Sequence, residues 1–372
     1  MQRTQIANVD DTLDVIEHVN QDHAGELKAI VMSLYPDCKI ERAELVELFE
    51  EGALIRQYQF ADTQTEDIFV PFEIKGTLEE KLFQLAYAHS PTEANAKDQF
   101  RFLTVSNTEV FTDKFVRLTI RSKRPFPSIW PGLCFSVHLT VLESISESKL
   151  KANWLSKISA DYYKRLSVFL LRVLPVSLRR KMIANTRKDV RAYTLRSSWQ
   201  ELHNGETIYC GYIDVFTQGR SKGSVWARKL KPGQVIYTSG DHPDKHAALI
   251  KGNNVIFCDE TAFPAVAGIL GQWQNPQAPT LIIISQTAKQ QNYFEHVDIP
   301  QDTRIHRIIC ETNQQADRVI EILKAQKQCD SVWGAMEMKM AKQVRHFLRN
   351  QHMLRGENNL VKPYWRCDTE NN

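Results

Sequence analysis

The chain has 372 residues, which is long enough for two or three domains with buried cores. Its 47 Lys and Arg residues nearly balance its 44 Asp and Glu residues, and a net charge of +3 does not favour nucleic acid as a partner. Seven isolated cysteines without a C-x-x-C pair argue against a disulfide framework or a zinc site. No stretch approaches the roughly 20 apolar residues of a membrane helix, and the first residues lack a signal-peptide core, so we expect a cytoplasmic protein without a transmembrane segment.

Residues 1–98 predict a small α+β domain. Apolar residues at helical spacing predict one amphipathic helix over 11–35, with Asp10 or Asp11 as its cap. Alternating patterns predict short strands at 43–48, 54–60 and 67–71, and a closing helix is expected over 77–89. The polar segment 90–99 is typical of a linker.

The first predicted helix carries the sequence HVNQDH, from His18 to His23. It is similar to the H-x-N-x-D-H opening of a small domain that accompanies haem-utilisation proteins. Two ligands on one helical face stand three or four residues apart, whereas these histidines stand five apart, so a shared metal site is not predicted. Two interpretations stay open: histidines that cap or pack the helix, or one imidazole as an axial ligand of haem.

Residues 99–245 predict a β-barrel that a helical insertion interrupts. Strands over 100–105, 109–111, 115–120 and 134–142 form its first half. The insertion, at about 147–188, has an apolar helical stripe that ends at Pro175 and then a cationic run. One interpretation is a solvated or domain-bridging helix, and the other is a transient contact with a membrane surface or a funnel for anionic chelates.

After the insertion, the stretch 191–196 combines two cations, an aromatic ring and a hydroxyl on one strand. Alternation puts Arg191 and Tyr193 on one face, and Thr194 and Arg196 on the other. An Arg fork suits a diphosphate, a Tyr ring offers a stacking plane, and a Thr hydroxyl can donate to a ring nitrogen. The pattern indicates a flavin cradle, although a surface strand with solvated arginines would have the same residues.

The barrel is expected to continue with strands at 207–217 and 235–239. Between them, a loop with Gly219 enters a helix at about Ser224. Amide groups at a helix start attract a diphosphate, and Lys222 and Ser224 add donors. The position of this loop shortly after the Arg-Tyr-Thr strand strengthens the prediction of a dinucleotide site.

Residues 246–372 alternate strands and helices, which predicts a parallel sheet. The expected strands are 247–258, 280–285, 304–310 and 331–333, and the expected helices are 262–272, 315–327 and 339–349. Ligands of such sheets bind beyond the carboxyl ends of the strands, which predicts one crevice lined by Asp259, Glu260, Thr261, Ser285 and Trp333. A G-x-G-x-x-G fingerprint is absent, so a standard Rossmann site is not supported.

Several of these stretches together resemble the siderophore-interacting protein family, whose members are flavin-dependent ferric-siderophore reductases related to ferredoxin reductases. The strand matches R-x-Y-[TS]-x-R; residues 213–227 resemble D-F-V-x-H-G-x-G-P-A-S-x-W-A, and residues 257–265 resemble G-D-E-T-A-x-P-A. A W-x-x-x-E pattern and a closing Y-W-R extend the resemblance to about 105–367. The chain departs from the family at Gln218, at Ser221-Lys222 and at Cys258, where His, Gly-Pro and Gly are usual.

The resemblance implies a multi-domain fold: an antiparallel six-stranded β-barrel that binds FAD, and a parallel-sheet α/β domain that binds NADPH or NADH. Tyr193 would stack on the flavin, and Thr194 would donate near its N5 atom. Lys339, Lys342, Arg345 and Arg366 would attract a ferric siderophore, either a catecholate or a hydroxamate, although such cations are often merely solvated. The implied cofactor contacts are Arg191, Tyr193, Thr194, Arg196, Asp214, Gly219, Lys222, Ser224, Trp226, Asp259, Glu260, Thr261, Ala262, Trp333, Glu337 and Trp365.

The expected reaction is reduction of siderophore-bound Fe(III), with no metal ligand from the protein. A nicotinamide gives up two electrons as hydride, whereas Fe(III) accepts one, and a flavin can handle both. The choice between NADPH and NADH stays open, with Lys289 and Arg318 as candidate contacts for a 2′-phosphate. The alternatives are a flavin-dependent haem-iron or general ferric reductase, and a carrier of haem or an iron chelate that has no enzymatic activity.

Overall fold

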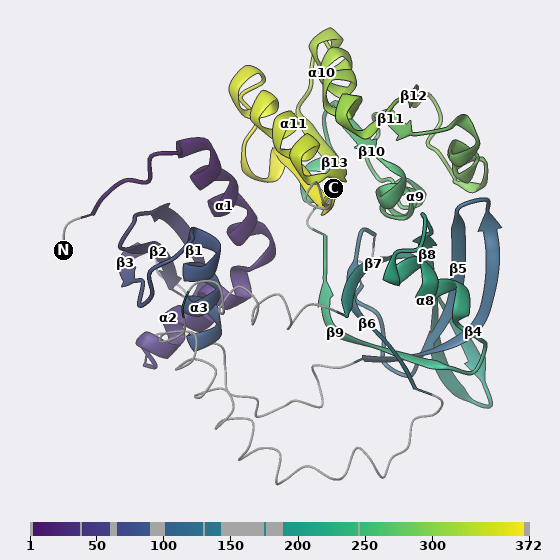
Figure 1. Cartoon of the computed structure of the whole chain (residues 1–372), viewed down its shortest axis with the longest axis horizontal. Helices are drawn as coiled ribbons and strands as arrows, with labels where there is room; N and C mark the ends of the chain where they lie inside the picture. Colours follow the sequence, from purple (N-terminus) through teal and green to yellow (C-terminus); the bar gives the residue numbers. More distant parts are fainter. Residues whose placement is uncertain are drawn as a thin grey trace. The chain divides into compact units, whose positions relative to one another are not determined.

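A computed structural model describes residues 3–37, 39–59, 65–89, 101–128, 131–142, 175, 189–244 and 246–367. The chain divides into two compact units: the N-terminal unit holds residues 1–97, and the C-terminal unit holds residues 98–145 and 189–372 (Figure 1). The predicted linker at 90–99 and, apart from Pro175, the predicted insertion at 147–188 lie outside the described residues.

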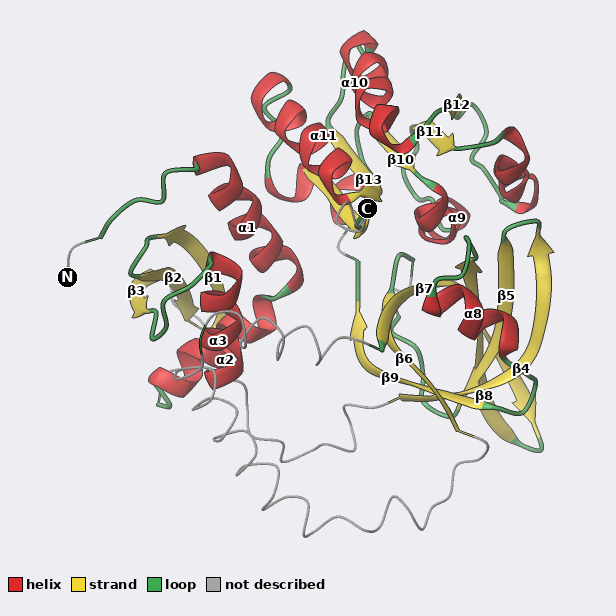
Figure 2. Cartoon of the chain, viewed as in Figure 1, coloured by secondary structure: helices red, strands yellow, loops and turns green. Residues whose placement is uncertain are grey.

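The N-terminal unit is an α+β domain, as predicted (Figure 2). Helices α1 (Val9–Asp22) and α2 (Ala24–Leu34) precede the strands β1 (Ile40–Leu48), β2 (Gly52–Gln59) and β3 (Thr65–Pro71), and α3 (Leu78–His89) follows. The strands pair antiparallel in the order β1-β2-β3. Apolar residues of α2 and α3, such as Val31 and Leu85, pack on Ile55 and Val70 of the sheet. The three predicted strands and the closing helix are therefore confirmed.

The single helix predicted over 11–35 is wrong, because the chain breaks it at His23. This residue has φ −127° and ψ 25°, and it both ends α1 and precedes α2. The apolar spacing ran through the break because both helices face the same core. The predicted cap also needs correction: Asn8 caps α1 by accepting from the Asp11 amide at 3.2 Å, while Asp10 and Asp11 lie in the first turn.

Within HVNQDH, the asparagine has a clear structural role. The Asn20 amide donates to the Leu45 carbonyl at 2.9 Å, and the Leu45 amide donates to Asn20 Oδ1 at 2.7 Å. Asn20 thus gives both backbone groups of Leu45 a partner, beside an irregularity in the pairing of β1 with β2. The His18 and His23 rings meet edge to face, 5.1 Å apart. The haem-related resemblance stays a prediction.

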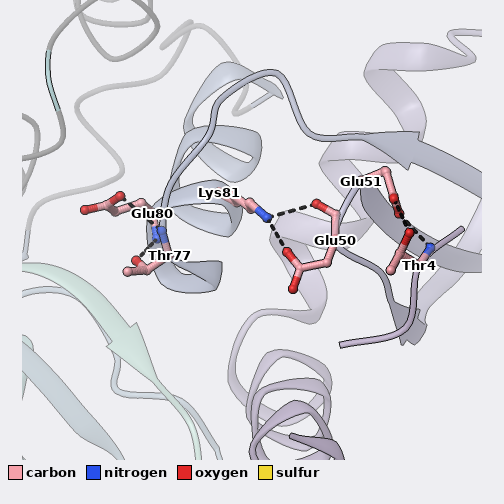
Figure 3. Close-up of polar contacts among 6 residues, drawn as sticks. All are labelled: Thr4, Glu50, Glu51, Thr77, Glu80 and Lys81. Carbon is pink, nitrogen blue, oxygen red and sulfur yellow. Dashed lines mark hydrogen bonds and ion pairs between the residues drawn. The ribbon is translucent and has the colours of Figure 1, made fainter. Parts of the chain in front are cut away.

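Charged side chains fasten α3 to the turn between β1 and β2 (Figure 3). The Lys81 ammonium donates to the Glu50 carbonyl at 2.9 Å and to its carboxylate at 3.1 Å. Thr77 and Glu80 exchange bonds at the start of α3, a reciprocal cap. These contacts leave the apolar face of α3 directed at the sheet.

The C-terminal unit begins with a closed barrel. Its strands are β4 (Arg101–Thr112), β5 (Phe115–Ser122), β6 (Cys134–Leu142), β7 (Val190–His203), β8 (Glu206–Phe216) and β9 (Val235–His242), paired antiparallel in the order β4-β5-β8-β7-β6-β9. Helix α8 (Lys222–Lys229) lies between β8 and β9 in the chain. Alternate residues such as Leu118, Phe135 and Ile213 fill the barrel interior.

A five-stranded parallel sheet follows, in the order β12-β11-β10-β13-β14. Its strands are β10 (Asn254–Cys258), β11 (Thr280–Ser285), β12 (Arg304–Ile309), β13 (Ser331–Glu337) and β14 (Asn359–Trp365). The helices are α9 (Phe263–Gly271), α10 (Gln315–Ala325) and α11 (Met338–Gln351), with short 3-10 turns η1 (Ala247–Ile250), η2 (Glu260–Ala262), η3 (Ala288–His296), η4 (Thr312–Gln314) and η5 (Gly356–Asn358). The predicted fold class is confirmed, and β14 is a strand that the periodicity did not predict.

Different helices pack on the two faces of this sheet. Helices α10 and α11 pack on one face, whereas α9 and η3 pack on the other, where Phe115 of the barrel joins the core. The barrel therefore adjoins the α9 face of the sheet. Gly334 in β13, which neighbours the central strand β10, lies against the Phe257 ring, and a Cβ there would collide with it. Among the described helices, none has both the length and the apolarity that crossing a membrane requires.

Candidate functional site

Strand β7 carries the Arg-Tyr-Thr motif between β6 and β8. Tyr193 pairs with Phe135 of β6, and Thr194 pairs with Cys134. The Tyr193 ring stacks on the Trp226 indole of α8, with centroids 5.6 Å apart and planes 5° apart. Thr194 is buried, while Arg191 is exposed. The structure therefore brings Tyr193 together with the second motif.

The start of α8 lies against Tyr193. Ser221 caps this helix by accepting from the Ser224 amide at 3.2 Å, and the two hydroxyls lie 2.8 Å apart. A Cβ at Gly223 would collide with the Tyr193 hydroxyl, so glycine lets the ring reach the helix start. The predicted helix begins two residues earlier than expected, at Lys222.

The loop before α8 is held by side chains of the helix itself. Gly219 has a φ of +60°, a conformation that glycine adopts without strain. The Arg228 guanidinium donates to the carbonyls of Gly219 at 3.1 Å and Thr217 at 3.3 Å, and Ser224 donates to Gln218 at 3.2 Å. Sequence reasoning missed Arg228, although a cation in the last turn of the helix after the loop was a usable signal.

These residues fit a flavin dinucleotide. The Trp226 indole nitrogen is buried and has no hydrogen-bond partner among the described residues, so an acceptor from a ligand would satisfy it. The exposed cations Arg191 and Lys222 lie on the two motifs, and Lys222 is within 2.9 Å of Asp189. Burial raises the pKa of Tyr193 to about 12, so its ring stays neutral at physiological pH.

Asp214, a predicted cofactor contact, lies inside a buried polar cluster. Its carboxylate accepts two bonds from Arg117, both at 2.7 Å, and one from the Tyr293 hydroxyl at 2.6 Å. The Nε of Arg196 stands 3.5 Å away. Tyr293 belongs to η3, so this cluster joins the barrel to the sheet. Sequence reasoning missed Arg117 and Tyr293, because neither lies in a recognisable motif.

The carboxyl edge of the sheet holds the third motif. The Asp259 carboxylate accepts from the Thr261 amide at 3.0 Å, from the Thr261 hydroxyl at 2.5 Å and from the Trp365 indole at 2.6 Å. Burial raises the pKa of Asp259 to about 7, although these bonds oppose the rise. The first and last strands of this segment, β10 and β14, thus end at the same edge, and Trp365 reaches Asp259 across β13.

Glu260 has a different partner. It is buried, and this burial raises the pKa of its carboxyl group. Its carboxylate accepts a hydrogen bond from the Gln286 backbone amide at 2.8 Å. Because Gln286 directly follows β11, this bond ties the ends of β10 and β11 together. Ala262 and Ser285 are wholly buried at the same edge, and Cys258 replaces the usual glycine there as a buried thiol.

The fourth motif supports the sheet from within. The Trp333 indole is completely buried and donates to Asp244 at 2.8 Å, and Lys362 donates to the same carboxylate at 2.7 Å. Glu337 caps α11 by accepting from the Lys339 amide at 2.6 Å, and it also accepts from the Cys367 amide at 3.1 Å. A nucleotide contact for Trp333 or Glu337 stays a prediction.

The predicted substrate cations are not equivalent. Lys339 and Arg366 are exposed; Lys339 lies in the first turn of α11, just after β13, and Arg366 directly follows β14. Arg345 donates to the Val361 carbonyl at 3.1 Å and so holds α11 on β14. Lys342 is half-buried on the same helix. Lys339 and Arg366 are therefore the best placed of the four for a ligand at this edge.

A closed six-stranded antiparallel barrel joined to a parallel α/β sheet is the fold of the ferredoxin-reductase class. Residues 252–368 match the model of the siderophore-interacting protein family, which confirms the predicted family resemblance for this part of the chain. No curated protein matches the chain in sequence.

Solved structures with a similar arrangement include two siderophore proteins. The siderophore-interacting protein from Acinetobacter baumannii is 18% identical, and the match covers 72% of this chain and 91% of that one, with a TM-score of 0.49. A siderophore utilization protein from T. fusca is 17% identical over 73% and 94% of the two chains, also with a TM-score of 0.49.

Proposed function

We propose that this protein reduces siderophore-bound ferric iron, with FAD on the barrel and NADPH or NADH as electron donor. The observation that carries the proposal is the contact of the Arg191–Arg196 strand with the start of α8, in a unit whose sheet segment matches the siderophore-interacting family. The cytoplasm, where these nucleotides are abundant, is the proposed location.

The residues of the barrel would bind and orient the dinucleotide. Arg191, Lys222 and the first amides of α8 would hold the diphosphate. The Tyr193 ring would support the flavin, and the Thr194 hydroxyl would donate to it. When bound, FAD would accept an electron pair from the nicotinamide and release electrons singly to iron.

The residues at the carboxyl edge would position the nucleotide and the substrate. The bonds of Asp259 with Trp365 and of Glu260 with Gln286 tie together the ends of β10, β14 and β11 at this edge. Lys339 and Arg366 would attract an anionic ferric chelate, so the protein needs no iron ligand of its own. Reduction to Fe(II) weakens binding to hard oxygen donors, which would release the metal from its chelator.

Anaerobic stopped-flow mixing tests the proposal. Protein loaded with FAD is mixed with NADPH or NADH, and then with a ferric catecholate, a ferric hydroxamate or haemin. We expect one nucleotide to bleach the flavin near 450 nm and a ferric siderophore to restore its colour. Reoxidation by haemin alone would assign the protein to haem iron, and a flavin that neither nucleotide bleaches would contradict the proposal.

The variant Arg191→Ala separates an enzyme from a carrier. We expect this change to weaken FAD binding by about 10-fold or more and to abolish iron reduction at limiting FAD, because a charge-assisted bond to the diphosphate is lost. Lys123→Ala, which removes a highly exposed cation elsewhere on the barrel, is the matched control. Unchanged iron handling by Arg191→Ala would support the carrier.

A further inference from the structure

Arg196, the second arginine of the strand motif, makes a hydrogen bond and an ion pair with other groups of the protein. Its Nη2 donates to the His296 carbonyl at 3.0 Å, and its Nε lies 3.5 Å from the Asp214 carboxylate. Its side chain is only 16% exposed. The carbonyl belongs to η3 of the sheet segment, so Arg196 links a barrel strand directly to the sheet.

The backbone of β7 is irregular at this residue. Leu195 pairs with Ile213 and Ser197 pairs with Tyr212, so Arg196 is the extra residue of a bulge. A bulge turns a side chain out of the regular alternation of a strand. Here the bulge stands beside Asp214, the residue after Ile213, and Arg196 is in contact with that carboxylate.

The other members of the cluster are rigidly held. The Arg117 guanidinium lies over the Phe111 ring at 3.4 Å and near the Tyr212 ring at 4.6 Å. Tyr293, the hydroxyl donor from η3, packs 4.6 Å from the Phe115 ring of the barrel. Asp214 itself is buried. The carboxylate is therefore a fixed anchor to which both Arg196 and η3 are attached.

We infer that Arg196 is a positioning residue that fastens the sheet to the barrel through Asp214 and η3, and that it does not bind the FAD diphosphate. This inference rests on the proposed function, because it assigns Arg196 to the spacing between the two nucleotide sites. To reach a diphosphate at α8, Arg196 would have to leave both of its present partners. Arg191 and Lys222 are exposed on the strand motif and at the start of α8, so we assign the diphosphate role to them.

FAD titration of the apoprotein, followed by flavin fluorescence, tests the negative half of this inference. We compare Arg196→Gln with Arg191→Gln, since both changes replace a guanidinium by an amide on the same strand. Arg191→Gln should weaken FAD by about 10-fold or more, whereas Arg196→Gln should stay within about 3-fold of the wild type. An equal loss in both variants would overturn the inference.

Rapid kinetics test the positive half. At saturating nucleotide, the rate constant of flavin reduction in Arg196→Gln should be lower by about 10-fold or more, because misplacement of the bound reactants slows the chemical step. The nucleotide concentration that gives half of the maximal rate should change little. Arg196→Lys, which keeps one donor, should restore part of the rate. Tyr293→Phe, which removes only the hydroxyl, should slow reduction in the same direction. An unchanged rate in Arg196→Gln would contradict the positioning role.

Hydrogen exchange in the apoprotein makes the test independent of the proposed reaction. In Arg196→Gln, the amides of 288–296 should exchange about 10-fold faster, since a tether of η3 is lost, while those of the barrel strand β5 should not change. Arg191→Gln should leave both segments unaffected. If no nucleotide reduces the wild type but η3 still loosens in Arg196→Gln, the proposed reaction fails and the tether stands. Unchanged exchange at η3 would reject the tether whatever the reaction.

Discussion

Asp214 and Asp259 are both buried carboxylates of the C-terminal unit, but their surroundings differ in charge. Asp214 lies among two guanidinium groups and a phenol. The hydrogen bonds to Asp259 come from an amide, a hydroxyl and an indole, and Glu260 is its neighbour. Neutral donors offset only part of the cost of burying a charge, so the pKa of Asp259 is raised to about 7.

The comparison shows that burial alone does not decide what a carboxylate does. A buried anion with cations around it is a fixed anchor, because removing any partner leaves a charge without compensation. A buried anion with neutral donors changes its protonation near physiological pH. The barrel junction therefore holds the rigid element of this unit, and the carboxyl edge holds the element that responds to pH.

The largest effect should come from breaking the anchor. Arg117→Ala should lower the free energy of unfolding by roughly 3–5 kcal/mol, because it leaves Asp214 buried without its two-point partner. Denaturant unfolding of the C-terminal unit measures this. Arg121→Ala, on the same strand, removes an exposed pair with Glu201 and should cost about 0–1 kcal/mol. Equal costs in the two variants would show that the cluster at Asp214 is no anchor.

The next effect concerns pH. Since the pKa of Asp259 is raised, the folded state binds a proton more tightly than the unfolded chain, and this group destabilises the fold as pH rises from about 4 to 7. The stability of the wild type relative to Asp259→Asn should therefore fall over that range, by at most about 4 kcal/mol at about 1.4 kcal/mol per pKa unit.

Asp330→Asn is the matched control for this pH test. The Asn253 amide and Gln328 hold the pKa of Asp330 below its usual range, so its contribution is present above the unfolded pKa and is lost as pH falls. The difference in unfolding free energy between wild type and Asp330→Asn should therefore be nearly flat across pH 4–7, and its slope, of opposite sign to that of Asp259→Asn, should appear only below about pH 4. If the difference in unfolding free energy between wild type and Asp259→Asn does not change across pH 4–7, Asp259 does not make the stability of this unit depend on pH.

A smaller effect should follow from removing one neutral donor. Trp365→Phe keeps an aromatic ring but loses the N–H that donates to Asp259, at a cost of about 1–2 kcal/mol. It should also extend the fall in stability to higher pH, because the Trp365 bond lowers the pKa of Asp259 and its loss raises that pKa further. Trp199→Phe, which loses a bond to the exposed Glu201, is the control and should leave that profile in place.

The smallest effect should come from a carboxylate that caps a helix. Glu337→Ala removes the acceptor of the Lys339 and Met340 amides and should cost about 1 kcal/mol, the usual value for a lost cap. Glu337→Gln keeps an acceptor and should restore part of this. If thermal unfolding shows a loss as large as that of Arg117→Ala, buried carboxylates at this edge are anchors too.

The sequence predicted the elements of the fold better than the contacts between them. Strand alternation and βαβ order are local patterns, so the individual barrel strands and the parallel sheet followed from them, whereas the six-stranded barrel and the joint role of the Tyr193 and α8 motifs followed from the family resemblance. His23 was missed because its neighbours keep helical apolar spacing. Strand β14 was missed because its polar and Pro-containing residues lack a strand period.

The roles of individual site residues were harder to predict, because they depend on partners distant in sequence. Asp214 is 97 residues from Arg117 and 79 from Tyr293, and no spacing rule joins them. The bulge at Arg196 is likewise invisible in a pattern that assumes strict alternation. A motif therefore indicated which residues matter, whereas only the folded chain indicates which of them face a ligand.

The buried thiol of Cys258 has a practical consequence for labelling chemistry. Burial raises the pKa of this thiol, so it stays protonated and is a poor nucleophile despite its place beside the motif at Asp259. Among the cysteines that the structure describes, Cys367 is the exposed one, and its amide is bonded to Glu337 at the same edge. An alkylating dye would thus attach to Cys367 and report on the carboxyl edge of the sheet, with Cys258 left unmodified.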